Sequence, residues 1–126
     1  MSKKILIVDD EEYIVKMLEL KLKEDGFECF SCTTTKEGIK AAKTFMPDLI
    51  LMDIMMPNVN GLEATEILKS SEETKHIPIL ILSAKSMEED QEKARELGAD
   101  GFLSKPILPQ KLLVKIRKFF EEEKVS

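Results

Sequence analysis

Five short apolar runs alternate with longer amphipathic stretches, and this alternation limits the possible folds more than any other feature of the sequence. The apolar runs lie at residues 5–8, 27–33, 49–52, 79–82 and 101–103. The stretches between them are about ten to fifteen residues long, and no linker rich in proline, glycine and serine separates them. Strands that alternate with helices are typical of βα units, which build a parallel sheet. The sequence therefore predicts an α/β fold with five parallel strands and five helices.

Capping and turn residues mark the ends of the predicted helices. The first helix extends from about Glu11 to Glu24 with Gly26 as its C-terminal stop signal, while Thr34 and Glu37 form a capping box at the start of the second. Pro109 suits the first turn of the last helix. The fourth helix has few apolar side chains, so we expect it to be weakly anchored.

The composition excludes several classes of protein. With 43% hydrophobic and 34% charged residues among 126, the chain has the balance of a globular protein, and we expect residues 1–126 to form a single domain. No apolar run approaches the roughly 20 residues that span a bilayer, and the N-terminus lacks the apolar region of a signal peptide. We therefore expect a cytoplasmic protein without membrane contact. A net charge of -5 without a basic stripe argues against direct nucleic-acid binding.

Cys29 and Cys32 form a C-x-x-C pattern, which is found in redox pairs and in half of many zinc sites. A redox pair of this kind lies at a helix N-terminus, whereas these cysteines fall in a predicted strand, where positions three apart point to opposite faces. A zinc site would also need a second pair of ligands. We interpret both residues as reduced, structural cysteines.

Polar side chains interrupt the apolar pattern at the C-terminal ends of four predicted strands. They are Asp9 with Asp10, then Asp53, Ser83 and Lys105. Right-handed crossovers bring the C-terminal ends of parallel strands to one edge of the sheet, where ligands bind. We therefore expect three carboxylates, a hydroxyl and an ammonium group to converge there.

This set of groups favours phosphoryl chemistry on a carboxylate. Clustered carboxylates repel one another unless a cation offsets their charge, and oxygen ligands without histidine or cysteine suit Mg²⁺. An aspartate beside such an ion can attack phosphorus and form an acyl phosphate. Lys105 would then neutralise phosphoryl oxygens, and Ser83 would donate a hydrogen bond. Because no glycine-rich nucleotide-binding motif is present, the phosphoryl donor is expected to be a partner protein or a small phosphodonor rather than ATP.

The motifs that carry these groups resemble the CheY-like receiver domains of response regulators over about residues 4–120. The matching segments are Ile5–Asp10, Asp53–Pro57 with Gly61, Ser83–Ala84 and Lys105–Pro106. The resemblance implies a doubly wound, flavodoxin-like fold whose strands lie in the order 2-1-3-4-5. It also implies two-component signalling, in which a histidine kinase or a histidine phosphotransfer protein donates the phosphoryl group from a phosphohistidine.

The resemblance further implies a role for each site residue. Asp53 is the phosphoacceptor, Lys105 contacts the phosphoryl group, and the bond from Lys105 to Pro106 is cis. The Mg²⁺ ligands are Asp10, Asp53 and the carbonyl of Met55, and Asp9 assists them.

A switch between two states is implied as well, in which Ser83 moves toward the phosphoryl group and Phe102 turns inward behind it. Phe102 stands where tyrosine is commoner, and because it has no hydroxyl, any coupling must come from packing. A downstream protein target is expected to bind across the fourth helix, the fifth strand and the fifth helix. Met55 and Lys85, two residues beyond Asp53 and Ser83, are placed to screen the phosphoryl group from water, so we predict slow self-dephosphorylation.

Two alternatives remain open at the level of the sequence. The chain could be a constitutive interaction module that keeps the fold and is never phosphorylated, or a hydrolase of the haloacid-dehalogenase type. The second is the weaker alternative, because such hydrolases carry another aspartate two places after the nucleophile and Met55 stands there. The phosphorylation switch that the motifs favour is expected to catalyse its own phosphorylation and dephosphorylation but to act mainly in signalling. It could be a complete regulator or a part cut from a longer one with an output domain after Ser126.

Overall fold

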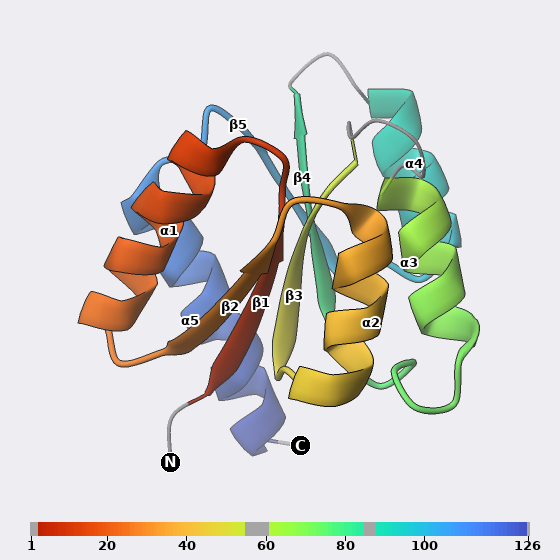
Figure 1. The fold of residues 1–126 in the computed structure, drawn as a ribbon, viewed down its shortest axis with the longest axis horizontal. Coiled ribbons are helices and arrows are strands. Elements are labelled where there is room, and N and C mark those ends of the chain that lie inside the picture. The colour runs from red at the N-terminus through yellow and green to blue at the C-terminus, as the bar shows by residue number, and fades with distance from the viewer. Residues whose placement is uncertain (1–2, 55–60, 85–87, 126) are drawn as a thin grey trace.

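The computed structural model describes residues 3–54, 61–84 and 88–125, which form five strands and five helices in strict alternation (Figure 1). The elements are β1 (Lys4–Val8), α1 (Glu12–Glu24), β2 (Glu28–Cys32), α2 (Thr35–Phe45), β3 (Leu49–Asp53), α3 (Gly61–Ser70), β4 (Ile79–Ala84), α4 (Glu88–Glu96), β5 (Gly101–Lys105) and α5 (Pro109–Val125). All four strand pairs are parallel, and the strand order is β2-β1-β3-β4-β5. The predicted fold class and strand order are confirmed.

Helices cover both faces of the sheet, with α1 and α5 on one side and α2, α3 and α4 on the other (Figure 1). Because successive side chains of a strand point to opposite faces, each inner strand contributes to two separate cores. In β1, Leu6 and Val8 pack under α2 and α3, whereas Ile5 and Ile7 pack under α1 and α5. This burial on both faces explains why the strand sequences are continuously apolar rather than alternating.

Strand β2 lies at an edge of the sheet and is less buried than β1 and β3, and it carries the polar residues Glu28, which is exposed, and Ser31, which is half-buried. Its two cysteines point to opposite faces, since Cys29 packs with the α1 and α5 core and Cys32 with the α2 and α3 core. Burial raises the pKa of each thiol to about 11, so both remain protonated near neutral pH. Both cysteines are free, which agrees with a structural role.

Each strand differs from its predicted range by one or two residues at an end, and β4 continues to Ala84 rather than residue 82. Strand β5 continues to Lys105, two residues beyond the predicted end, because Ser104 and Lys105 still pair with Ser83 and Ala84. Helix α1 begins one residue later than predicted, at Glu12. Within the described part of the chain, no helix is both long enough and apolar enough to cross a membrane.

Candidate functional site

The register of the sheet brings the predicted site residues to one edge. Val8 pairs with Met52, and Asp53 pairs with Leu82, so the C-terminal ends of β1, β3 and β4 lie side by side. Asp9 remains tied to the sheet, because its backbone N–H donates to the carbonyl of Cys32 at 3.1 Å. The strand pairing therefore places Asp9 and Asp53 at the same edge of the sheet.

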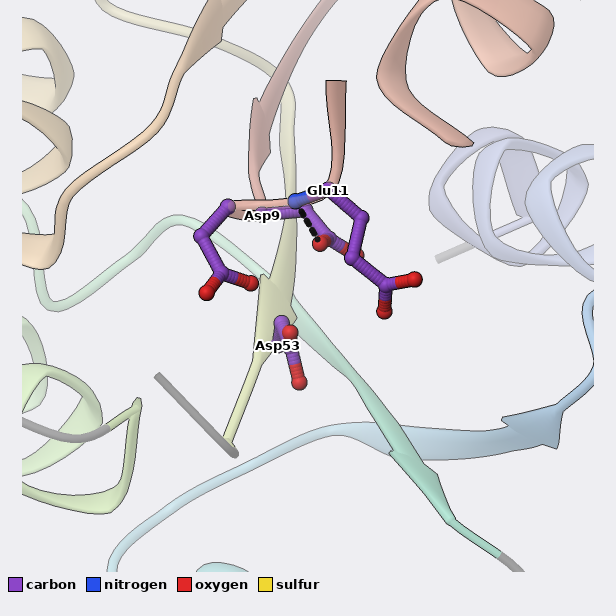
Figure 2. A group of neighbouring side chains, drawn as sticks. Asp9, Glu11 and Asp53 are labelled. Atoms are coloured by element: carbon purple, nitrogen blue, oxygen red, sulfur yellow. Dashed lines mark hydrogen bonds between the residues drawn. The ribbon is translucent and has the colours of Figure 1, made fainter. Parts of the chain in front are cut away.

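Four carboxylates form a cluster at this edge. One oxygen from each of Asp9, Asp10, Glu11 and Asp53 lies within 4.8 Å of the others. Figure 2 shows the side chains of Asp9 and Glu11 in the segment after β1, with Asp53 facing them from the end of β3. Asp9 and Asp53 are buried, at 0% and 2% exposure, whereas Asp10 and Glu11 are exposed. Sequence reasoning missed Glu11, although its place directly after the acidic pair was a signal.

The position of Asp9 is fixed by a tight local turn. The backbone N–H of Glu11 donates to Asp9 Oδ1 at 2.9 Å, which is the dashed line in Figure 2. Helix α1 takes Glu11 as its N-cap, and that side chain makes no capping hydrogen bond. Asp10 is therefore not the N-cap of this helix.

Lys105 joins the acidic groups from the other side of the site. Its Nζ lies 2.9 Å from Glu11 Oε1, 3.2 Å from Asp53 Oδ2 and 3.2 Å from Asp9 Oδ2. The side chain is 19% exposed, so the ammonium is largely withdrawn from water. One cation thus contacts three of the four carboxylates, and it comes from the last residue of β5.

Burial and the neighbouring charges have opposite effects on the pKa of Lys105, and both burial and the charge of Asp53 raise the pKa of Asp9. Burial raises the pKa of Asp9 from 3.8 to about 6, and the nearby charge of Asp53 adds to the rise, whereas the Glu11 N–H and Lys105 lower it. Burial lowers the pKa of Lys105, but the hydrogen bond to Glu11 and the charges of Asp53 and Asp9 outweigh it, so that this pKa is raised. Lys105 therefore remains protonated, while the charge on Asp9 is costly.

Asp9 offers the best evidence that the cluster could hold a cation. Its Oδ2 atom is buried and accepts no hydrogen bond from the described residues, and its nearest charge partner is Lys105. A buried carboxylate oxygen that lacks a hydrogen bond is unfavourable, and a bound cation would satisfy it. Oxygen donors of this kind suit Mg²⁺ better than transition metals. The residues present therefore fit a magnesium ion.

Gly61 supports the site from the start of α3. A Cβ at this position would lie 2.3 Å from the carbonyl oxygen of Asp53 and 2.6 Å from the Cα of Ile54, which is closer than real contacts allow. Only glycine lets the helix approach the chain directly after the proposed phosphoacceptor. The family motif that includes Gly61 thus has a steric basis here.

The two proposed switch residues contact the same helix. Ser83, which is 0% exposed, accepts a hydrogen bond from Gln91 Nε2 at 3.1 Å. Phe102 packs against the core beneath α2 and α3, and the guanidinium carbon of Arg95 lies 5.2 Å from its ring centroid. Sequence reasoning missed both Gln91 and Arg95, because α4 carried no motif that marked them.

One of the remaining predictions can be checked in the structure, and two fall outside the described residues. The peptide bond between Lys105 and Pro106 is cis, as expected. Met55 and Lys85 lie outside the described residues, so the expected metal contact of the Met55 carbonyl and the expected screening by both side chains stay predictions.

Comparison with known families agrees with this arrangement. Residues 5–117 match the model of the response regulator receiver domain. The chain is 36% identical, over 119 residues, to the polar-differentiation response regulator DivK of Brucella ovis, covering 94% of this chain and 97% of that protein. It is also 36% identical, over 126 residues, to the alkaline phosphatase synthesis transcriptional regulatory protein PhoP of Bacillus subtilis. The match covers 100% of this chain but only 52% of that protein, so the chain spans about half the length of the Bacillus regulator.

Solved structures extend the likeness to the fold. A CheY-like response regulator receiver domain protein from Methanospirillum hungatei superposes with a TM-score of 0.92 at 28% identity, covering 100% of both chains. The chemotaxis protein CheY4 of Vibrio cholerae gives a TM-score of 0.88 at 29% identity, covering 94% of this chain and 98% of that chain. These similarities are consistent with two-component signalling and do not support the hydrolase alternative. The chain belongs to the response regulator receiver domain family.

Proposed function

We propose that the chain is a phosphorylation switch that accepts a phosphoryl group on Asp53. The observation that carries the proposal is the contact of Lys105 with Asp53 and Asp9 inside a cluster of four carboxylates. A carboxylate held beside an ammonium group and a divalent cation is suited to attack phosphorus, because both cations offset the negative charge of the phosphoryl oxygens. Asp53 is the candidate, since it stands at the end of β3, contacts Lys105 and belongs to the acidic cluster that would hold the cation.

The reaction exchanges one bond to phosphorus for another. A carboxylate oxygen of Asp53 forms a bond to phosphorus as the bond from phosphorus to the nitrogen of a phosphohistidine breaks, and the departing imidazole takes up a proton. Lys105 contributes a fixed positive charge next to the entering oxygen, and its contact with Asp53 keeps that charge in place. The hydroxyl of Ser83 is available to donate a hydrogen bond to the transferred group.

Mg²⁺ is the cation that we propose for the acidic cluster, with Asp10 and Asp53 as ligands, Asp9 assisting and the Met55 carbonyl as a further ligand. When bound, it supplies positive charge that stabilises the phosphoryl oxygens. The protein's own contribution is to hold Asp9 and Asp53 out of water, so that the cation binds against an existing negative charge. Metal binding should therefore lower the pKa of Asp9, which burial and, to a smaller extent, the charge of Asp53 raise.

We further propose that a histidine kinase or a histidine phosphotransfer protein donates the phosphoryl group, and that the switch acts on a downstream protein. We propose the face formed by α4, β5 and α5 for this partner, because β5 and α5 line a groove of about 440 Å³ with apolar and basic side chains, among them Leu103, Val114, Lys111 and Lys115. Val114 is 56% exposed there. A cytoplasmic location is proposed on the analogy of the Bacillus regulator, whose name assigns it to transcription.

The test is the intact mass of the protein after incubation with acetyl phosphate. We expect one added phosphoryl mass in the presence of Mg²⁺, none in EDTA, and none in Asp53→Asn. Asp48→Asn serves as the matched control, since Asp48 lies at the opposite end of β3 and accepts a hydrogen bond from the Lys4 N–H. A protein that gains no phosphoryl mass under any of these conditions would favour the constitutive interaction module.

A further inference from the structure

Helix α4 contacts both proposed switch residues through side chains one turn apart. Gln91 donates from Nε2 to the Ser83 hydroxyl oxygen at 3.1 Å, and the guanidinium carbon of Arg95 lies 5.2 Å from the ring centroid of Phe102. Because residues four apart share one face of a helix, a single face of α4 reaches β4 and β5 at once. The hydroxyl and the ring, which lie on neighbouring strands, are thus joined through the helix.

These two contacts matter because few side chains are buried in the part of α4 for which the structure describes them. Among residues 91–97, only Ala94 is buried, and Gln91 and Leu97 are half-buried. Helices α1, α2 and α3 each bury three or more residues. A helix with so few buried side chains opens more readily than the rest of the fold, so single polar contacts have a large share in its stability.

The Gln91 contact is sensitive to movement of the hydroxyl. At 3.1 Å, the pair is close to the longest distance of a good hydrogen bond, and a shift of about 0.5 Å or more away from Gln91 would break it. The Arg95 contact is sensitive to the ring in the same way, because a cation binds the face of an aromatic ring only within about 6 Å of its centroid. Any motion of Ser83 or Phe102 away from α4 therefore weakens the attachment of this helix.

We propose that Gln91 and Arg95 form a two-point latch that holds Ser83, Phe102 and helix α4 together in the unphosphorylated protein. The inference rests on the proposed function, in which Ser83 moves toward the phosphoryl group and Phe102 turns inward. Both motions break the latch, so phosphorylation releases α4 from the sheet. Gln91 and Arg95 are positioning residues, and they give Phe102, which has no hydroxyl, a way to sense the site.

The test is amide hydrogen exchange at residues 92–97, measured with and without phosphorylation by acetyl phosphate and Mg²⁺. In the unphosphorylated protein, Gln91→Met should raise exchange about fivefold, the factor that corresponds to about 1 kcal/mol for one hydrogen bond. Arg95→Gln should raise it as well, and Arg95→Lys, which keeps the cation, should restore most of the protection. After phosphorylation, the wild type should exchange as fast as the variants. The ratio of variant to wild-type exchange should therefore fall from about five to about one as the latch hydrogen bond is lost.

Two controls separate the latch from general loss of helix stability. Lys93→Gln removes a cation from an exposed position of α4, and Glu92→Gln breaks the ion pair with Arg95 without removing the guanidinium group. Neither should change the response of exchange to phosphorylation.

The proposal is overturned if Gln91→Met exchanges at the wild-type rate in the unphosphorylated protein. It is also overturned if the variant exchanges faster than the wild type by the same factor before and after phosphorylation, as expected for a purely structural contact. Intact mass on the same samples distinguishes failure of the proposed function. A wild type that gains the phosphoryl mass without faster exchange in α4 refutes the latch alone, whereas a wild type that gains none refutes the phosphorylation itself.

Discussion

Replacing Asp9 by asparagine is expected to stabilise the metal-free protein near neutral pH. Asp9 is 0% exposed, and its pKa is raised from 3.8 to about 6, mainly by burial. Between these two pH values the folded protein binds more protons than the unfolded chain, so this group lowers the free energy of unfolding as pH rises. The loss is complete above about pH 6 and is absent below about pH 4.

The size of the effect follows from the shift. The two pKa values differ by about two units, and each unit corresponds to about 1.4 kcal/mol, so the ionised Asp9 costs the folded state about 3 kcal/mol. This net cost already includes the attraction of Lys105, whose Nζ lies 3.2 Å from Asp9 Oδ2, so the loss of that ion pair is not a separate cost of the asparagine variant. Lys105 keeps Glu11 and Asp53 as partners, so a net gain of about 1 to 3 kcal/mol is expected for the variant.

The assay is urea unfolding followed by far-ultraviolet circular dichroism in EDTA, at about pH 7.5 and about pH 5. The difference between wild type and Asp9→Asn isolates this group, because the other titrating groups are common to both. Glu12→Gln removes one exposed negative charge nearby and should change the free energy of unfolding by less than about 0.5 kcal/mol. A variant less stable than the wild type at the higher pH, or a difference that does not shrink at the lower pH, would refute this account of Asp9.

Three further changes have defined outcomes. Lys105→Met should destabilise the metal-free protein by about 3 kcal/mol at neutral pH, since it removes the ammonium group that contacts the buried carboxylates of Asp9 and Asp53. Mg²⁺ should recover part of the loss in a thermal melt, and equal loss with and without Mg²⁺ would contradict this. Gly61→Ala should cost about 2 kcal/mol or more in urea unfolding, because its Cβ would lie 2.3 Å from the Asp53 carbonyl oxygen, and a neutral substitution would show that the helix can move aside. Met55→Asn should shorten the lifetime of the phosphorylated protein, each tenfold change equalling about 1.4 kcal/mol of barrier, and an unchanged half-life would remove the proposed screening role.

The sequence was sufficient to predict the sheet and the edge at which the site lies. The apolar runs fixed the strands because the inner strands are buried on both faces, and the parallel order then required Asp9, Asp53, Ser83 and Lys105 to meet. The strand order and the position of the site both follow from the backbone topology, and the apolar runs and short motifs of the sequence are sufficient to predict that topology.

The contacts between side chains of the site could not be predicted in the same way. Glu11 reaches Lys105 across 94 residues of sequence, and Gln91 reaches Ser83 from a helix without a motif. Such contacts depend on the direction in which α1 and α4 leave the sheet and on the rotamers of long side chains. The apolar periodicity of the sequence determines neither the helix direction nor these rotamers, so the contacts of Glu11 and Gln91 are known only from the three-dimensional structure.

The central claim is that Asp53 is the carboxylate that bonds to phosphorus, and its most direct test locates the modified residue. Protein phosphorylated by acetyl phosphate in Mg²⁺ is reduced with borohydride, which converts an aspartyl phosphate into homoserine, and is then digested and analysed by tandem mass spectrometry. The account predicts homoserine at position 53 and unmodified aspartate at Asp9 and Asp10. Homoserine at Asp9 or Asp10, or its absence from all three positions in protein that carries the added mass, would contradict it.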